Sequence, residues 1–294
     1  MPRPTWTTAL ARKAVRVAKR TAVEAGRMLL ARRARRPRIE YKGAINLVTA
    51  SDRASQALIQ RRLGEAFPGH DVLSEEDLDT GGGSPYRWIV DPLDGTTNYA
   101  HGFPLWCVSI ALEVDGAIRV GAVYNPNLDE LFWAVRGGGA WLGDRRIRVS
   151  GTNSLGKSLL ATGFPYDLHE RPDAHFERFT SFCMTAQAVR RAGAAALDLC
   201  CVGAGRFDGF WESRLHPWDV AAGALVVEEA GGRVTGYDGS PFDVMAREIV
   251  ASNGRVHAEM LALLARVERT RDSACAAGSG RPGTRPRSAC RRAT

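Results

Sequence analysis

The stretch WIVDPLDGTTNYAHGFP, residues 88–104, places two aspartates, Asp91 and Asp94, at the end of an apolar run. Residues 87–91 have the apolar character of a buried strand, and Pro92 favours an extended conformation for Asp91. We therefore expect the strand to end at Asp91 and Asp94 to return to the same side after a turn. Neighbouring carboxylates repel one another and resist burial, so a cation is expected between them.

The residues that follow the two aspartates are suited to an anion. Gly95 permits an unusual backbone conformation, and Thr96 and Thr97 are predicted to open a helix. Free N–H groups at the start of a helix attract phosphate. One short segment therefore offers oxygen ligands for a hard cation beside a cradle for an anion.

Two further acids complete an all-oxygen set. Glu75 in SEED (74–77) follows a predicted strand, and Asp219 in PWDVAAG (217–223) opens a predicted helix. Because no His or Cys accompanies these acids, Mg²⁺ or Mn²⁺ is favoured over zinc. Taken singly, Asp91 or Asp94 is more often a turn residue, Glu75 a solvated loop acid and Asp219 a helix N-cap. The residues alone favour neither a shared metal site nor separate structural roles, since no local feature shows that the segments meet in space.

The net charge of +8 conceals three parts of different sign. Residues 1–42 carry +11 and residues 269–294 carry +6, whereas residues 43–268 carry −9. Basic ends can contact nucleic acid or another polyanion. The tail arginines have no aromatic residues between them, as single-strand binding would favour, so solvated Arg-rich ends are the preferred interpretation.

The 294 residues suffice for one large domain or two fused layers. Residues 6–33 are predicted to form an amphipathic helix. An Arg-rich N-terminus can also be an organellar transit peptide, but the pattern runs on into the globular part and favours a structural helix. No apolar stretch approaches the roughly 20 residues that span a bilayer. The cysteines form no CxxC pair, which favours a reducing compartment and hence the cytoplasm.

The pattern of elements divides the chain at residue 152. The N-terminal part, 1–152, contains a predicted hairpin over 105–126 with Asp115 and Gly116 as its turn, and further strands over 129–150. The C-terminal part, 153–269, begins with a strand over 158–164. Its predicted helices span 172–187, 193–205, 217–232 and 255–269. Residues 270–294, rich in Gly, Pro, Arg, Ser and Ala, are predicted to be a disordered basic tail.

The opening motif resembles the first signature of the inositol monophosphatase family, and WDVAAGALVVEEAGG (218–232) resembles its second. Segments such as LSEED, DELFWAVRGGGAWLG and RRAGAAALDLCCVGAGRFDGFWE are also similar and occur in the same order. The resemblance covers about residues 8–268. It implies an α+β fold, a layered α-β-α-β-α sandwich of the inositol monophosphatase and fructose-1,6-bisphosphatase type, with Mg²⁺ and phosphate where the layers meet.

The resemblance also implies the metal ligands. Glu75, Asp91 and the backbone carbonyl of Leu93 match the ligands of a first ion. Asp91, Asp94 and Asp219 match those of a second, and Glu75 also matches a ligand of a weaker third ion. Such ions neutralise phosphoryl oxygens, acidify a bound water and steady the leaving alkoxide. With no cysteine in a P-loop-like setting and no paired His, we expect direct attack by water without a phosphoenzyme.

Other residues match supporting roles. Thr96, with Glu75, matches the pair that orients the attacking water, and Gly95, Thr96 and Thr97 match phosphate contacts. Asp52 matches an acid just behind the ligands of the third ion, and Lys42 matches a basic residue at the mouth of the site.

The polyol side of the site is expected at Gly193, Ala194, Ala195 and Glu212. Ala194 departs from the hydroxyl residue usual in the family. If that contact is made through the backbone little is lost, whereas a side-chain contact would reduce affinity for the polyol. Glu212 in FWES matches an acceptor of substrate hydroxyl groups, and its alternative is a surface strand acid.

The leading hypothesis is a Mg²⁺-dependent, Li⁺-sensitive phosphomonoesterase, an inositol-phosphate phosphatase. Its substrate would be myo-inositol 1-phosphate or a related small polyol or sugar phosphate, and the family suggests a homodimer. A second hypothesis keeps the chemistry and changes the alcohol to histidinol phosphate, fructose 1,6-bisphosphate or a nucleotide 3′-phosphate. A third, of another class, is an RNA-associated regulatory factor, which the two basic ends would suit.

Overall fold

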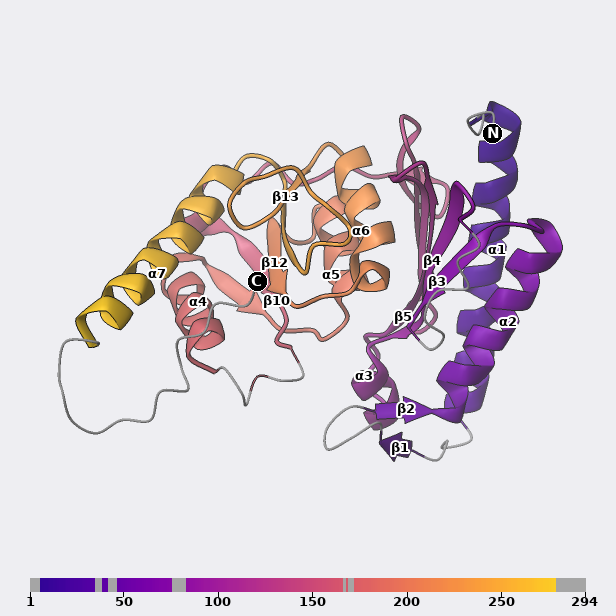
Figure 1. The fold of residues 1–294 in the computed structure, drawn as a ribbon, viewed down its shortest axis with the longest axis horizontal. Helices are drawn as coiled ribbons and strands as arrows, with labels where there is room; N and C mark the ends of the chain where they lie inside the picture. The colour runs from indigo at the N-terminus through magenta and orange to yellow at the C-terminus, as the bar shows by residue number, and fades with distance from the viewer. Residues whose placement is uncertain are drawn as a thin grey trace.

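The structure, a computed structural model, describes residues 6–34, 39–41, 47–75, 83–165, 168 and 172–278. Its layers are seen edge-on in Figure 1. Helices α1 (Thr8–Arg33) and α2 (Ala50–Ala66) cover one face of a seven-stranded sheet, and α5 (Ala195–Gly203) and α6 (Pro217–Glu229) lie on its other face. A five-stranded sheet follows, and α4 (Pro172–Thr185) and α7 (His257–Gly278) form the outermost layer. The predicted α-β-α-β-α sandwich is confirmed.

The seven-stranded sheet runs in chain order from β3 to β9. Strand β3 pairs in parallel with β4, and every later pair is antiparallel. The predicted hairpin is confirmed, because Asp115 (φ 51°) and Gly116 (φ 76°) form the turn between β5 and β6. The strands are β3 (Asp71–Ser74), β4 (Tyr86–Asp94), β5 (Cys107–Val114), β6 (Ala117–Asn125), β7 (Glu130–Val135), β8 (Gly139–Leu142) and β9 (Arg145–Arg146).

Strand β4 continues past the predicted end at Asp91. Asp91 pairs with Ser109 and Asp94 pairs with Cys107. Three positions on β4 therefore match two positions on β5, and the register shifts between the two pairs. Pro92 has no N–H to donate to the ladder, which accounts for an irregularity at this point. Both aspartates therefore lie on the bulged end of β4. The sequence had predicted that the strand ends at Asp91 and that a turn comes before Asp94.

The first helix packs closely on the seven-stranded sheet because its inner face is made of small residues. Ala14, Ala18, Ala22 and Ala25 are fully buried. At Gly26 a β-carbon would lie 2.5 Å from the ring of Tyr124 on β6, so only glycine allows this approach. The predicted N-terminal helix is thus confirmed as part of the core.

The second sheet has the strand order β11-β10-β12-β14-β13. Strand β10 pairs in parallel with β11 and β12, whereas β14 is antiparallel to both β12 and β13. The strands are β10 (Leu159–Thr162), β11 (Ala188–Arg190), β12 (Gly209–Ser213), β13 (Arg233–Thr235) and β14 (Glu248–Ser252). The other short elements of the described residues are β1 (Ile39–Tyr41), β2 (Leu47–Thr49), α3 (Thr96–His101) and the 3₁₀ helix η1 (Leu155–Lys157).

The C-terminal helix is longer than its sequence pattern indicates. Helix α7 runs from His257 to Gly278, so it continues into the segment predicted as a disordered tail from residue 270. Residues 279–294 lie outside the described residues. The predicted division at residue 152 falls in the connection between β9 and β10 and stays a prediction. None of the described helices combines the length and the apolar character that a bilayer span requires.

Candidate active site

Five acids from four segments line one cleft of about 470 Å³. Glu75 follows β3, Asp91 and Asp94 lie on β4, Asp219 lies in the first turn of α6, and Glu212 lies on β12 beside them. Leu93, Gly95 and Thr96 also line this cleft. The structure thus brings together most of the residues that the sequence suggested. The cleft is bounded by elements of both sheets.

One oxygen of each aspartate is held by a backbone N–H group. Leu93 N donates to Asp91 Oδ1 at 2.9 Å, within the bulged end of β4. Ala196 N, at the start of α5, donates to Asp94 Oδ2 at 2.9 Å. His216 N donates to Asp219 Oδ2 at 2.7 Å. Such bonds fix the direction in which a carboxylate points, as is usual for side chains that hold a metal ion.

Asp219 occupies the third position of its helix rather than the N-cap. His216 is the N-cap, Pro217 opens the helix, and His216 and Asp219 form a capping box. Asp219 therefore lies at a helix start, as the sequence indicated. Its carboxylate takes part in the capping box and also lines the cleft. Only one oxygen of the carboxylate is used by the cap.

Gly95 brings two distant segments into contact at the cleft. Its φ of 86° lies in the left-handed region, and it caps α3 at Thr96, as the sequence predicted. A β-carbon at Gly95 would lie 3.0 Å from the carbonyl oxygen of Leu105 and 3.3 Å from the β-carbon of Ala194. A larger residue would therefore push the loop before α5 away from the aspartates.

Thr96 is held from behind by Asp52. The Thr96 hydroxyl lies 3.2 Å from Asp52 Oδ1 and 3.1 Å from the carbonyl oxygen of Leu93. Both side chains are buried, Asp52 at 1% exposed and Thr96 at 6%. Asp52 thus lies next to Thr96, and its predicted role near a third ion stays a prediction. Lys42 lies outside the described residues.

Burial and mutual repulsion shift the pKa values of the acids upward. The pKa of Asp91 is raised well above its usual range by burial, and then by the charges of Glu75, Asp94 and Asp219. Burial raises the pKa of Asp94 to about 6 and that of Asp219 to about 7. Carboxylates in this state are costly when ionised unless a cation lies among them.

The donor set fits a hard divalent cation. Its members are carboxylates and one backbone carbonyl, with no soft ligand, and this chemistry suits Mg²⁺. Within the described ranges no three His, Cys, Asp or Glu side chains form a ready-made metal cage. The set is therefore suited to Mg²⁺ in the type of its donor atoms.

The stability of the metal-free protein should fall as the pH rises from 6.5 to 8.5. Asp219, whose pKa is about 7 in the fold, has an ordinary pKa of about 3.9 when unfolded. A raised pKa in the fold contributes stability that is full below the unfolded value and is lost as pH rises through the folded value. Thermal melts in EDTA should show a lower Tm at pH 8.5 than at pH 6.5.

The matched control is Asp219→Asn, which has no carboxylate to titrate and should flatten this dependence. His257, whose pKa is lowered to about 4 mainly by burial, still loses a proton in the unfolded state near pH 6.5, which makes stability rise slightly with pH. This contribution is the same in both proteins and cancels in the comparison. A Tm that rises with pH in EDTA, equally in both proteins, would contradict the interpretation.

Glu212 is a buried acid of the cleft and not a surface strand residue. It is 8% exposed, and its carboxylate oxygens occupy the space that a side chain at position 163 would need, where the chain has glycine. Burial raises the pKa of Glu212 well above its usual range, followed by the charges of Asp198 and Asp219. Gly163 therefore makes the room that lets this carboxylate lie in the cleft with the other acids.

The other predicted substrate residues lie at the edge of the site. Asn98 Nδ2 donates to the carbonyl oxygen of Ala192 at 2.8 Å, which ties the loop at Gly193 to α3. Through this loop Ala194 reaches Gly95, and Ala195 begins α5. Thr97 is exposed and is not part of the cleft lining, so any contact it makes there has to come through its backbone.

Sequence reasoning missed two features of the site. Asp198 is 2% exposed, and burial, followed by the charge of Asp94, raises its pKa well above the usual range. Its signal was a single acid within the otherwise apolar run 193–205. Arg214 and Arg247 also line the cleft and supply positive charge at its wall. Neither residue belongs to a motif that could have identified it from the sequence.

Comparison with known proteins gives consistent matches. A profile described as the inositol monophosphatase family matches residues 11–269. The inositol-1-monophosphatase of Synechocystis sp. is 47% identical over 229 residues, 77% of this chain and 80% of the relative. Nus factor SuhB of Pseudomonas aeruginosa is 43% identical over 228 residues, 76% of this chain and 84% of the relative. The solved inositol monophosphatase of Anabaena (Nostoc) sp. has a TM-score of 0.81 at 42% identity, covering 88% of this chain and 97% of that one.

Proposed function

Since the chain belongs to the inositol monophosphatase family, we propose that it is a Mg²⁺-dependent phosphatase that hydrolyses myo-inositol 1-phosphate or a related small polyol phosphate. The observation that carries the proposal is the meeting of Glu75, Asp91, Asp94 and Asp219 in one cleft. These acids come from three segments far apart in the chain, yet their side chains line the same space. The raised pKa values of Asp91, Asp94 and Asp219 support a cation among these acids.

The proposed ligands are those of the sequence hypothesis. Glu75, Asp91 and the carbonyl of Leu93 would hold one ion, Asp91, Asp94 and Asp219 a second, and Glu75 a weaker third, with Mn²⁺ as an alternative metal. When bound, Mg²⁺ supplies charge that offsets the phosphoryl oxygens and the leaving oxygen and acidifies water. Asp91, which belongs to both sets, is the most buried of the three aspartates.

The remaining residues would position the phosphate and water. The hydroxyl of Thr96, held by Asp52 and Leu93, faces the cleft with Glu75 and would orient the attacking water. Backbone N–H groups at Gly95, Thr96 and Thr97 would bind phosphoryl oxygens. Because the fold holds both the hydroxyl group and the backbone N–H group of Thr96, these groups need little rearrangement when the ester binds.

The polyol would lie toward Glu212 and the loop before α5. A carboxyl group there can hydrogen-bond hydroxyl groups of the alcohol. Ala194 lies beside Gly95 at the cleft, with its β-carbon 3.3 Å from where a β-carbon at Gly95 would be. The methyl group of Ala194 packs on Gly95, so we assign its substrate contact to the backbone. This arrangement favours a polyhydroxy alcohol over an apolar one.

The proposal is tested by phosphate release from a panel of esters. Treatment with EDTA should lower activity below about 1% of its initial value, and Mg²⁺ should restore it, because the arginines of the cleft do not acidify water as bound Mg²⁺ does. Li⁺ should inhibit. myo-Inositol 1-phosphate should give a higher kcat/KM than histidinol phosphate, fructose 1,6-bisphosphate or a nucleotide 3′-phosphate. Full activity in excess EDTA would refute the metal-dependent mechanism, and another order of esters would change the substrate alone.

A second candidate function is an RNA-associated regulatory role. One relative is named Nus factor SuhB, and residues 1–42 of this chain carry a net charge of +11. Salt-sensitive RNA binding that persists in an Asp91→Asn protein would support that role beside catalysis. A homodimer and a cytoplasmic location remain parts of the proposal, to be checked by sedimentation and by localisation of the tagged full chain.

A further inference from the structure

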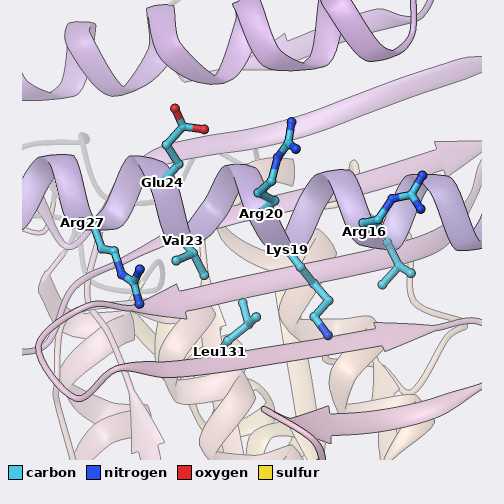
Figure 2. Close-up of a pocket in the computed structure, with 8 residues that line it drawn as sticks. Arg16, Lys19, Arg20, Val23, Glu24, Arg27 and Leu131 are labelled. Atoms are coloured by element: carbon cyan, nitrogen blue, oxygen red, sulfur yellow. The ribbon is translucent and has the colours of Figure 1, made fainter.

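The outer face of the molecule carries a groove of about 680 Å³ between α1 and β7. Val15 and Val23 of α1 and Leu131 of β7 form its half-buried floor, and we call this surface the α1 groove. Figure 2 shows Lys19 and Arg27 directed from α1 toward the strand that carries Leu131. The groove lies across the seven-stranded sheet from α6, so it is separate from the acidic cleft.

The rim of the α1 groove is strongly basic. Arg16, Lys19, Arg20 and Arg27 line it along successive turns of α1. Glu24, the one acid of the lining, is neutralised by Arg62 of α2, whose guanidinium nitrogens lie 2.6 and 3.0 Å from its two oxygens. Arg27 lies 3.8 Å from Asp129, a contact between two largely exposed side chains that contributes little. The surface therefore keeps an excess of positive charge.

The floor of the groove is apolar and continuous with the core. Val15, Val23 and Leu131 pack against the same buried cluster that holds the inner face of α1. Apolar side chains left half-exposed beneath a charged rim are characteristic of surfaces that bind another protein segment. A ligand that offered negative charge alone would leave this floor in contact with water.

The aromatic residues nearby are not available for stacking bases on both faces. Lys19 Nζ lies 4.0 Å from the ring centroid of Trp133, and Trp141 stacks on that ring at 5.4 Å with an interplanar angle of 8°. Trp133 is therefore engaged by a cation and by a second ring. Single-stranded nucleic acid binds best where aromatic faces are open, which favours a protein ligand for this groove.

We propose that the α1 groove binds an acidic, amphipathic helical segment of a partner protein. Apolar residues on one face of such a helix would cover Val15, Val23 and Leu131, and its carboxylates would pair with Arg16, Lys19, Arg20 and Arg27. The segment 279–294 does not fit, because it contains five Arg and no acid. The proposal assigns the complementary charge to a partner protein.

The test measures fluorescence anisotropy of a labelled 18-residue peptide of Leu, Glu and Ala, about 18 residues being enough for five helical turns. Its Leu residues share one helical face at i, i+3, i+4 and i+7. Two competitors are a peptide of the same composition in which Leu is scattered, and a poly-uridine oligonucleotide. The full chain should bind the amphipathic peptide in a salt-dependent manner, at least about tenfold more tightly than the scattered peptide.

Three variants locate the binding surface. Arg16→Glu with Arg20→Glu should weaken the peptide about tenfold or more, and Val23→Thr should weaken it with little change in volume. Arg12→Glu with Arg32→Glu makes the same charge change at exposed positions of α1 that do not line the groove, and should have little effect. Thermal melts and phosphate release serve as fold controls, since none of these residues lies in the cleft.

Four outcomes overturn the proposal. They are no binding of the amphipathic peptide, equal binding of the scattered peptide, tighter binding of poly-uridine through the same arginines, and self-association of the chain that the same substitutions abolish. The last two would assign the groove to nucleic acid or to a second copy. None of these outcomes bears on the metal-dependent phosphatase, which is tested separately by chelation.

Discussion

Asp91→Asn should lower kcat by about 10²- to 10³-fold, a loss of about 3–4 kcal/mol of transition-state stabilisation. Asp91 is 2% exposed and is the acid on which Glu75, Asp94 and Asp219 all act. An amide keeps the shape and can still accept the bond from Leu93 N, but it removes one negative charge from the centre of the set. The measurement is steady-state phosphate release at saturating Mg²⁺.

The fold should survive this substitution. Because Asp91 is buried beside like charges, its neutral replacement should leave the Tm in EDTA unchanged or higher at pH 8. Glu212→Gln is a comparison on the substrate side and should act mainly through KM. Asp144→Asn, an exposed acid away from the cleft, is the matched control and should change neither constant. A kcat for Asp91→Asn within about twofold of wild type would remove Asp91 from the metal-binding set.

Deleting residues 1–33 should abolish cooperative folding. The deletion removes α1, whose fully buried Ala14, Ala18, Ala22 and Ala25 and buried Leu29 cover β5 and β6. The uncovered face includes Val108, Ile110 and Tyr124 of the same core cluster. Exposing this surface costs more than the roughly 5–15 kcal/mol by which a domain is stable. Circular dichroism melts and solubility measure the outcome.

Deletion of residues 279–294 is the matched control for that truncation. This segment begins after α7 and has no large apolar residue, so its removal should leave the melt and kcat/KM near those of the full chain. If the shorter tail deletion abolishes activity, the tail belongs to the site or to an assembly. If loss of residues 1–33 is harmless, α1 is dispensable and the reading of the N-terminus as a removable targeting segment gains support.

Local patterns predicted the elements well, because each was set by neighbouring residues. The turn at Asp115 and Gly116, the left-handed Gly95 and the helix start at Pro217 all follow from the properties of single residues. The meeting of Asp219 with Asp91 could not be derived in this way, since 127 residues separate them in the chain. Only resemblance to a family suggested that contact, and the structure places both in one cleft.

The misses have a common physical cause in long-range packing. The register shift after Asp91 depends on how Ser109 and Cys107 pair with β4, which the motif itself does not specify. Asp198 lies in a run that reads as a buried helix, and its proximity to Asp94 arises only when α5 packs at the strand end. The part of α7 beyond residue 270 was not predicted, because the composition of residues 270–294 is typical of disordered segments.

The hydrogen bond from Ala196 N to Asp94 joins the end of a strand in the first sheet to the first turn of α5. Glu75 and Asp91 come from the segment before residue 95, whereas Glu212 and Asp219 are translated more than a hundred residues later. A nascent chain that has completed its first sheet therefore holds only part of the acidic set. If Asp219 holds a metal ion, as proposed, hydrolysis begins only after synthesis has passed α6, and prematurely terminated chains are inert toward phosphate esters.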